Sequence, residues 1–253
     1  MRGIERTGVS DGDTFRSAGI SADALKWIAL LTMLCDHVGA VLLPQYPILR
    51  LIGRTAFPLF VWLLVEGFSH TSSRKRYLGR MAAFAILSEL PFDLALYGRP
   101  DWQSQNVFVT LSIGLLMLIF LERAMDEWDR RREAGENAFW QAAEACGIAA
   151  AAMVAAELLR VDYGGSGPLL AALFYCYARK KKPGLVFSFL LFCLSMGLLS
   201  ALVEVFGIVS VPLIARYNGI RKRKKKGRLF YLFYPVHLLI LYLIHELWKN
   251  VLA

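Results

Sequence analysis

Three ionisable residues lie inside one apolar stretch near the N-terminus, residues 24–43: Lys26, Asp36 and His37. Lys26 and His37 are eleven positions apart, which in an α-helix corresponds to about 1100° of rotation and about 16 Å of rise. A helix would therefore present both side chains within about 20° of the same direction, at different depths of a membrane. Ionisable groups within a membrane span are costly and usually functional. A span that served only as an anchor would carry none of the three.

A histidine beside a carboxylate favours general-base catalysis, because the carboxylate fixes the imidazole tautomer and stabilises the imidazolium. Asp36 is adjacent to His37, but neighbours on a helix point about 100° apart, so Glu89 or Asp93 is an alternative orienting carboxylate. The chain has no GxSxG, Walker or HExxH pattern, which leaves a serine hydrolase, an ATPase and a zinc protease without support. Its four cysteines lack the spacing of a zinc site, so no metal is expected. A proton-coupled transporter or flippase would use the same buried groups, and this alternative stays open.

The composition indicates an integral membrane protein. Of 253 residues, 57% are hydrophobic, and the mean hydropathy is +0.46, whereas soluble domains are nearer half apolar. The apolar blocks are as long as a bilayer is thick and predict an all-α, polytopic transmembrane helical bundle. About nine spans are expected, at residues 24–43, 49–68, 78–97, 106–122, 138–159, 166–178, 184–199, 201–216 and 229–250. Residues 1–22 would form a polar N-terminal tail and residues 23–253 one membrane domain.

Basic clusters occur in every second predicted loop, and the loops at 44–48, 98–105 and 160–165 carry few cations. The clusters are Arg74, Lys75, Arg76 and Arg80; Arg123, Arg130, Arg131 and Arg132; Arg179, Lys180, Lys181 and Lys182; and the cations of residues 221–228. Because cytoplasmic loops hold the Lys/Arg excess, we expect a cytoplasmic N-terminus and a C-terminus outside. The basic loops that set this topology explain the formal net charge of +9, and the same loops would be attracted to anionic lipid. No nucleic-acid partner is therefore expected.

The first two predicted spans would form an antiparallel hairpin, and its register brings charged residues to common depths. Lys26 lies level with Glu66, and His37 lies level with Arg54. Charges in a bilayer need partners, so we predict that Lys26 pairs with Glu66 and that Arg54 pairs with Asp36 or Asp93.

The third and fourth predicted spans would form a second hairpin that carries polar side chains to the same outer half of the membrane. The members of this polar group are expected to be Asp36, His37, Arg54, Glu89, Asp93 and Asn106.

The last predicted span carries Tyr234, Pro235 and His237 near its inner side. A proline inside a helix frees a backbone carbonyl and kinks the helix, and a membrane tolerates such a break only beside a cavity or other protein. We expect Tyr234 and His237 to line a cavity. In the alternative interpretation, His237 only donates a hydrogen bond to the carbonyl freed by Pro235.

Several motifs in these segments resemble those of one known family. The first group is Leu25-Lys26-Trp27-Ile28-Ala29, Met33, Asp36-His37-Val38-Gly39, Arg50-Leu51-Ile52-Gly53-Arg54-Thr55-Ala56-Phe57-Pro58-Leu59-Phe60 and Glu66-Gly67-Phe68. The second group is His70-Thr71, Lys75-Arg76-Tyr77, Arg80, Ser88-Glu89-Leu90-Pro91-Phe92-Asp93 and Asn106-Val107-Phe108-Val109-Thr110-Leu111. The third group is Tyr217-Asn218-Gly219 and Phe230-Tyr231-Leu232-Phe233-Tyr234-Pro235-Val236-His237-Leu238. Together these motifs resemble the TraX family over residues 24–115 and 215–245.

The TraX family takes its name from a conjugation-plasmid protein that acetylates the N-terminus of pilin. It is similar to the wider membrane acyltransferase superfamily, whose first span carries a basic residue, ten residues and then a histidine. Lys26 and His37 match that spacing. The resemblance implies that residues 23–253 form an acetyltransferase domain in a bacterial cytoplasmic membrane, with cytoplasmic acetyl-CoA as donor. The acceptor would be an amine or hydroxyl of a peptide N-terminus, a glycan or a small molecule at the membrane or its outer face.

The resemblance also implies roles for individual residues. His37, with Asp36, would be catalytic, either as general base or as acyl carrier. Residues assigned to the substrate or the transition state are Arg54, Glu66, Glu89, Asp93 and Asn106, with Arg54 or Asn106 as a candidate for the oxyanion. Residues assigned to CoA are Lys26, Arg221 and Arg223 at its phosphates, and Tyr234 and His237 along its channel. A membrane assembly factor without catalysis is a third class that the sequence leaves open.

Overall fold

The computed structural model describes residues 19–220 and 227–252, and regular structure within them is helical apart from two isolated β-bridges. The helices are α2 (Ala22–Val41), α3 (Pro47–Gly53), α4 (Ala56–His70), α5 (Arg74–Tyr97), α6 (Val107–Glu133), α7 (Phe139–Leu158), α8 (Ser166–Lys180), α9 (Leu185–Ser195), α10 (Leu198–Glu204), the 3₁₀ helix η1 (Val205–Val209), α11 (Ser210–Ala215) and α12 (Gly227–Leu252). The predicted all-α class is confirmed.

Six segments within the described residues are long and apolar enough to cross a membrane. They are Ala22–Val41, Pro47–His70, Val107–Glu133, Phe139–Leu158, Leu198–Ala215 and Phe230–Val251. The sequence predicted about nine spans, and the other three correspond to α5, α8 and α9. Helices α8 and α9 have only 15 and 11 residues, and α5 has 24 residues but carries several charges.

The second predicted span is broken rather than straight. Pro47 begins α3, as suits a first helical position, and the break at Arg54 and Thr55 separates α3 from α4. The predicted span 201–216 is also broken, into α10, η1 and α11. Gly197, with φ of 85°, directly precedes this segment and allows the sharp connection to α9.

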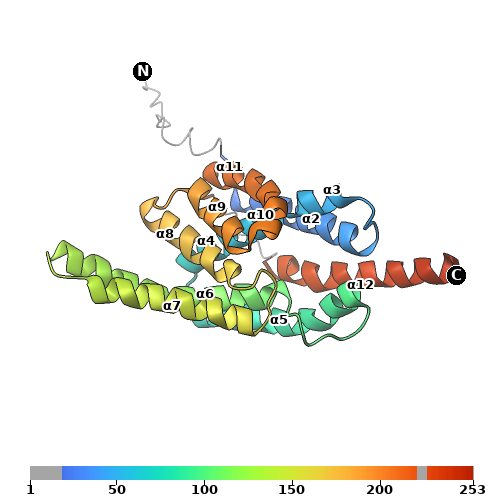
Figure 1. The fold of residues 1–253 in the computed structure, drawn as a ribbon, viewed down its shortest axis with the longest axis horizontal. Coiled ribbons are helices and arrows are strands. Elements are labelled where there is room, and N and C mark those ends of the chain that lie inside the picture. The colour runs from blue at the N-terminus through green and yellow to red at the C-terminus, as the bar shows by residue number, and fades with distance from the viewer. Residues whose placement is uncertain (1–18, 221–226, 253) are drawn as a thin grey trace, which may run out of the picture.

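Helix α2 packs against α3, α4 and α12, while α5 packs against α6 and α12, and α6 packs against α7 and α8. Figure 1 shows the α6–α7 hairpin extending to one end of the molecule and the C-terminal part of α12 extending to the other. The core between the helices is filled by aromatic and aliphatic side chains. The largest of those that are fully buried are Phe68, Phe174, Phe189 and Phe192.

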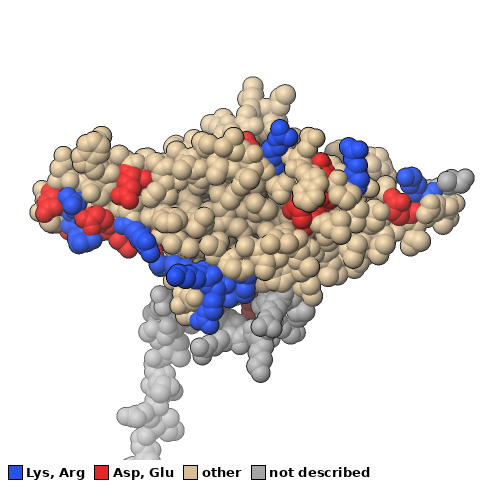
Figure 2. Space-filling view, turned by 90° about the horizontal axis from the view of Figure 1, so that it is seen from below, with Lys and Arg blue, Asp and Glu red and all other residues tan. Residues whose placement is uncertain are grey.

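Many large apolar side chains remain on the surface, including Ile86, Leu158, Leu199 and Val251, each exposed by 78% or more. The face in Figure 2 is mostly uncharged, with charged side chains gathered in separate patches. A surface of this kind is stable in contact with lipid. With the six apolar segments, it makes the chain a multi-pass membrane protein.

Three of the four predicted basic loops lie on one side of the bundle, and the fourth, at residues 221–228, falls largely outside the described residues. Arg74 at the start of α5 donates to Glu122 of α6 at 2.6 Å. Arg179 at the end of α8 donates to Asp126 and Asp129 of α6 at 2.6 and 2.7 Å. These contacts join three of the segments that the sequence assigned to one side of the membrane.

Two loops with few cations lie together at the other ends of the helices. The amide of Gln105 donates to the carbonyl of Arg160 at 3.1 Å, and Gln105 accepts from the amide of Asp162 at 2.9 Å. The ends of α5, α6, α7 and α8 therefore alternate between the two sides as predicted.

Candidate functional site

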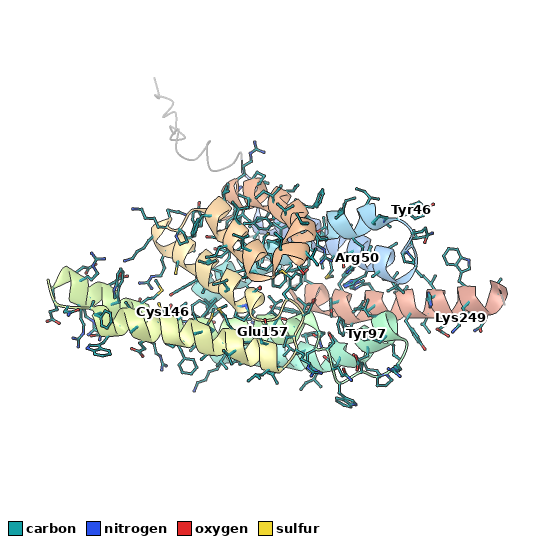
Figure 3. All side chains as sticks on the ribbon, viewed as in Figure 1. Tyr46, Arg50, Tyr97, Cys146, Glu157 and Lys249 are labelled. Atoms are coloured by element: carbon teal, nitrogen blue, oxygen red, sulfur yellow. The ribbon has the colours of Figure 1, made fainter. Side chains whose placement is uncertain are left out.

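A cavity of about 230 Å³, called the outer cavity here, contains the histidine singled out by the sequence. Its charged and titratable lining residues are Asp36, His37, Arg50, Arg54, Tyr97, Asp162, Tyr163 and Tyr234. These side chains come from α2, α3, α5, α12, the residue after α3 and the loop after α7. Arg50 and Tyr97 approach the cavity from α3 and from the end of α5 (Figure 3).

Asp36 is held by two arginines. Its carboxylate forms ion pairs with Arg50 and Arg54, and Arg54 also donates from Nη1 to Oε1 of Glu204 at 2.8 Å. Gly53 makes room for this arrangement, because a Cβ atom at that position would collide with the Asp36 side chain. The predicted pair of Arg54 with Asp36 is present, whereas the alternative pair with Asp93 is not formed.

His37 contacts a second histidine rather than a carboxylate. Its Nδ1 lies 2.7 Å from Nε2 of His237, and Nδ1 of His237 lies 2.7 Å from the carbonyl oxygen of Phe233. Both rings are buried, with 9% and 5% of their surfaces exposed. The prediction that Asp36, Glu89 or Asp93 orients His37 is therefore wrong within the described residues. The Asp36 carboxylate forms ion pairs with Arg50 and Arg54 instead.

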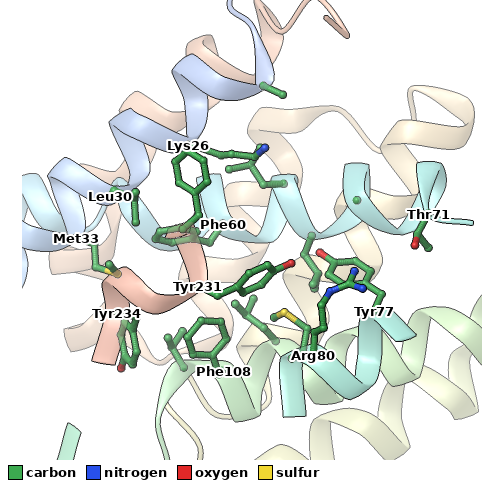
Figure 4. Close-up of a pocket in the computed structure, with 18 of the residues that line it drawn as sticks. Lys26, Leu30, Met33, Phe60, Thr71, Tyr77, Arg80, Phe108, Tyr231 and Tyr234 are labelled. Carbon is green, nitrogen blue, oxygen red and sulfur yellow. The ribbon is translucent and has the colours of Figure 1, made fainter. Parts of the chain in front are cut away.

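A larger cavity of about 440 Å³, the inner cavity, lies at the basic side of the bundle. Lys26 and Arg80 approach it from opposite walls with the Tyr231 ring between them, and Thr71 lies at the end away from Met33 and Tyr234 (Figure 4). The rest of the lining is largely apolar and aromatic. A cavity that combines two cations with apolar walls suits a ligand with an anionic head and a thin arm.

The two cavities share four lining residues: Met33, Phe60, Val107 and Tyr234. Lys26 lines the inner cavity and His37 lines the outer one. Since the two residues are separated by eleven positions on α2, the path between them is about 16 Å long. A single ligand that passes between the shared residues would reach both cavities.

Two other predicted positions differ in the structure. Lys26 pairs with Asp23 at 3.5 Å and not with Glu66. Glu66 accepts from the hydroxyl of Tyr217 at 2.6 Å, and its Oε1 lies 3.4 Å from Nδ1 of His70. Each of these two side chains therefore has a partner other than the one predicted. His237 lines neither cavity, so its expected place on a channel wall is wrong, while Tyr234 lines both.

The other predicted polar residues hold the connection between α5 and α6 and line neither cavity. Asn106 caps α6, donates to the carbonyl of Ala85 at 2.8 Å and donates to the carboxylate of Glu89. Asp93 accepts from the amide of Asp101 at 2.9 Å. Glu89, Asp93 and Asn106 therefore lie close together, as predicted, but they do not line the outer cavity that contains His37.

Sequence reasoning missed Arg50, Asp162 and Glu204. Arg50 lies one helical turn before Arg54, and Glu204 is an ionisable residue inside an apolar segment, which is a signal that sequence carries. Asp162 lies in the loop after α7, where Thr110 donates to its backbone carbonyl at 2.5 Å. Burial raises the pKa of the Asp162 carboxyl, and the nearby guanidinium of Arg54 opposes this shift.

Arg221 and Arg223, predicted to bind CoA phosphates, lie outside the described residues. Across residues 19–220 and 227–252, no three His, Cys, Asp or Glu side chains gather in the manner of metal ligands.

The fold and the site define a helical membrane protein with two adjoining cavities and a buried pair of histidines, of which His37 lines the outer cavity. The family model described as "TraX protein" matches residues 21–245. The chain therefore belongs to the TraX family.

Similarity to individual proteins extends over different shares of the chain. A probable fimbrial assembly protein FimC, serogroup H1, of Dichelobacter nodosus is 27% identical over 89% of this chain and 96% of its own length. An uncharacterised protein RP591 of Rickettsia prowazekii is 47% identical over 41% of this chain and 38% of its own. Protein TraX of Escherichia coli is 29% identical over 40% of each chain. No solved structure matches the chain significantly.

Proposed function

We propose that this protein is an acetyltransferase that moves an acetyl group from cytoplasmic acetyl-CoA to an acceptor at the outer face of a bacterial cytoplasmic membrane. The observation that carries the proposal is the pair of adjoining cavities, with Lys26 and Arg80 in one and His37 in the other. This arrangement lets a donor and an acceptor meet from opposite sides. In this proposal the basic side of the bundle faces the cytoplasm, because cytoplasmic loops hold the Lys/Arg excess.

The donor would enter through the inner cavity. Its phosphates would contact Lys26 and Arg80, and its thin pantetheine arm would pass Met33 and Tyr234 toward His37. About 16 Å separates the two ends along α2, a distance that an extended pantetheine arm can cover. This route keeps the charged head of CoA outside the hydrocarbon region.

The acceptor would enter the outer cavity, where His37 acts as general base. Nε2 of His37 takes the proton from the acceptor amine or hydroxyl as its nitrogen or oxygen attacks the thioester carbonyl. The tetrahedral intermediate then expels the CoA thiolate, which takes up the proton. Arg50 also lines this cavity, and its side chain is 41% exposed, so it is placed to stabilise the oxyanion.

The relatives suggest which acceptor to test first. One relative is named a probable fimbrial assembly protein, and the alignment with it covers 89% of this chain. We therefore propose a subunit of a surface fibre as the first acceptor candidate, with its reactive amine or hydroxyl presented to the outer cavity.

The test is release of free CoA from acetyl-CoA by the purified protein in the presence of a fibre-subunit acceptor, followed with a thiol reagent. We expect acetyl-CoA-dependent release by wild type and a loss of about 10²–10⁴-fold in His37→Ala, the usual contribution of a general base. His245→Ala is the matched control, because this exposed histidine lies on α12 and lines neither cavity. A transporter, a flippase or an assembly factor would release no CoA, and this result would contradict the proposal.

A further inference from the structure

We infer that His237 is a positioning residue that fixes the tautomer of the neutral His37 ring through a series of two hydrogen bonds ending at the Phe233 carbonyl. The inference rests on the proposed function for its catalytic consequence, but its structural part stands alone. The series runs from Nδ1 of His37 to Nε2 of His237 at 2.7 Å, and from Nδ1 of His237 to the Phe233 carbonyl at 2.7 Å.

The direction of both hydrogen bonds follows from the carbonyl. A backbone carbonyl can only accept, so Nδ1 of His237 must carry the proton that is donated to Phe233. In a neutral imidazole the other nitrogen is then an acceptor. Nε2 of His237 therefore accepts from Nδ1–H of His37. This leaves Nε2 of His37 with its lone pair, and no described residue hydrogen-bonds to it.

The surroundings lock the His237 ring in this orientation. The ring stacks on Phe233, with centroids 4.9 Å apart and planes 19° apart, and it packs edge-on against Tyr234 at 5.8 Å. His237 lines neither cavity, so its side chain is not available to a ligand there. It contacts the base and not the substrate, which distinguishes a positioning residue from a binding residue.

A neutral partner suits this depth of the membrane. A carboxylate that oriented His37 would need its own counter-charge, because an unpaired charge within the bilayer is costly. The carboxylate next to His37 in the sequence, that of Asp36, is paired with Arg50 and Arg54. The carbonyl of Phe233 accepts a hydrogen bond from His237 without adding a charge. His237, on α12, in turn accepts a hydrogen bond from His37 on α2.

The first experiment compares His237→Ala with His237→Gln in the full-length protein. The Gln side chain has a carbonyl that accepts from His37 and cannot take up a proton. We expect the kcat of His237→Ala to fall by about 10–100-fold, less than removal of the base itself, while the KM and the Kd for acetyl-CoA stay within about twofold of wild type. His237→Gln is expected to recover most of the kcat, and His245→Gln is the matched control. A rise in KM for acetyl-CoA with kcat unchanged, or a Gln variant as slow as the Ala variant, would overturn the inference.

The second measurement is independent of activity. In wild-type protein with ¹⁵N-labelled histidine, we expect a protonated Nδ1 and a bare Nε2 at His37, and we expect this tautomer preference to persist in His237→Gln and to be lost in His237→Ala. If wild type shows the tautomer but releases no CoA, the proposed acetyl transfer fails while the positioning contact stands. A proton on Nε2 of His37 in the wild type would overturn the inference, even if acetyl transfer were demonstrated and the variants did not fold.

Discussion

His37 and His237 are separated by 200 positions in the chain, yet Nδ1 of His37 lies 2.7 Å from Nε2 of His237. The contact requires α2 and α12 to pack together, as they do in the structure. The first and last membrane segments thus complete one site. Variants at either end of the chain should therefore affect the same chemistry.

Gly53 sets the space for Asp36, and we predict that Gly53→Ala disrupts its pairing with Arg50 and Arg54. The added Cβ atom would occupy the position of the Asp36 carboxylate, and leaving a buried charge without its partner costs about 3–5 kcal/mol. Thermal unfolding in detergent should show a clear loss of stability. Gly79→Ala is the control, because nothing lies within 4 Å of a Cβ atom there. Equal melting temperatures for the two variants would contradict the packing described for Asp36.

Lys26 and Arg80 are predicted to bind the donor phosphates. Lys26→Met and Arg80→Met should each weaken CoA binding by about tenfold or more, as expected for a hydrogen bond to a charged group. Added salt should weaken wild-type binding, because the attraction is electrostatic, and should reduce the difference between wild type and variants. Lys249→Met, near the far end of α12, is the control. Calorimetric titration with CoA measures the effect, and affinities that match the control in both variants would contradict this assignment.

Met33 lies in the wall shared by the two cavities, and we predict that Met33→Trp separates donor binding from transfer. The larger ring would obstruct the passage toward His37 while Lys26 and Arg80 remain accessible. CoA binding should therefore persist, whereas CoA release from acetyl-CoA should fall to the level of His37→Ala. A folded variant with wild-type turnover would show that the donor reaches His37 by another route.

Asp162 is predicted to make stability depend on pH. Burial raises the pKa of its carboxyl in the folded protein, above the unfolded value of about 4. Its contribution to stability is therefore fully present below the unfolded pKa and is lost as the pH rises through the folded pKa. Relative to Asp162→Asn, the wild type should lose melting temperature as the pH increases from about 4 toward neutrality. A difference that stays constant or changes in the opposite direction would contradict the burial of this carboxyl.

The helical class and the pair of Asp36 with Arg54 could be predicted from the sequence, because apolar blocks of span length and a local hairpin determine both. Glu204 and His237 could not be placed in this way. They reach the site from α10 and α12, 150 residues from Arg54 and 200 from His37, and hydropathy does not say which helices pack together. The Lys26–Glu66 pair failed because each side chain has another partner: Lys26 pairs with Asp23 on its own helix, and Glu66 accepts from the hydroxyl of Tyr217.

Some predicted residues were found in the right region but with a different task. Glu89 and Asn106 lie at the joint of α5 and α6, where they bond to each other. A polar side chain in a span signals that it has a partner, but the sequence does not say whether that partner is a ligand or the protein itself. Only the three-dimensional arrangement separates the cavity wall from the helix joint.

A structure of the protein with a non-hydrolysable thioether analogue of acetyl-CoA tests the central claim most directly. We expect the phosphates to contact Lys26 or Arg80, the pantetheine arm to pass between Met33 and Tyr234, and the acyl carbon to lie close enough to Nε2 of His37 for an acceptor atom to fit between them. An analogue bound elsewhere, or one that enters through the outer cavity with its head group beside Arg50, would contradict the proposed route and the role of His37.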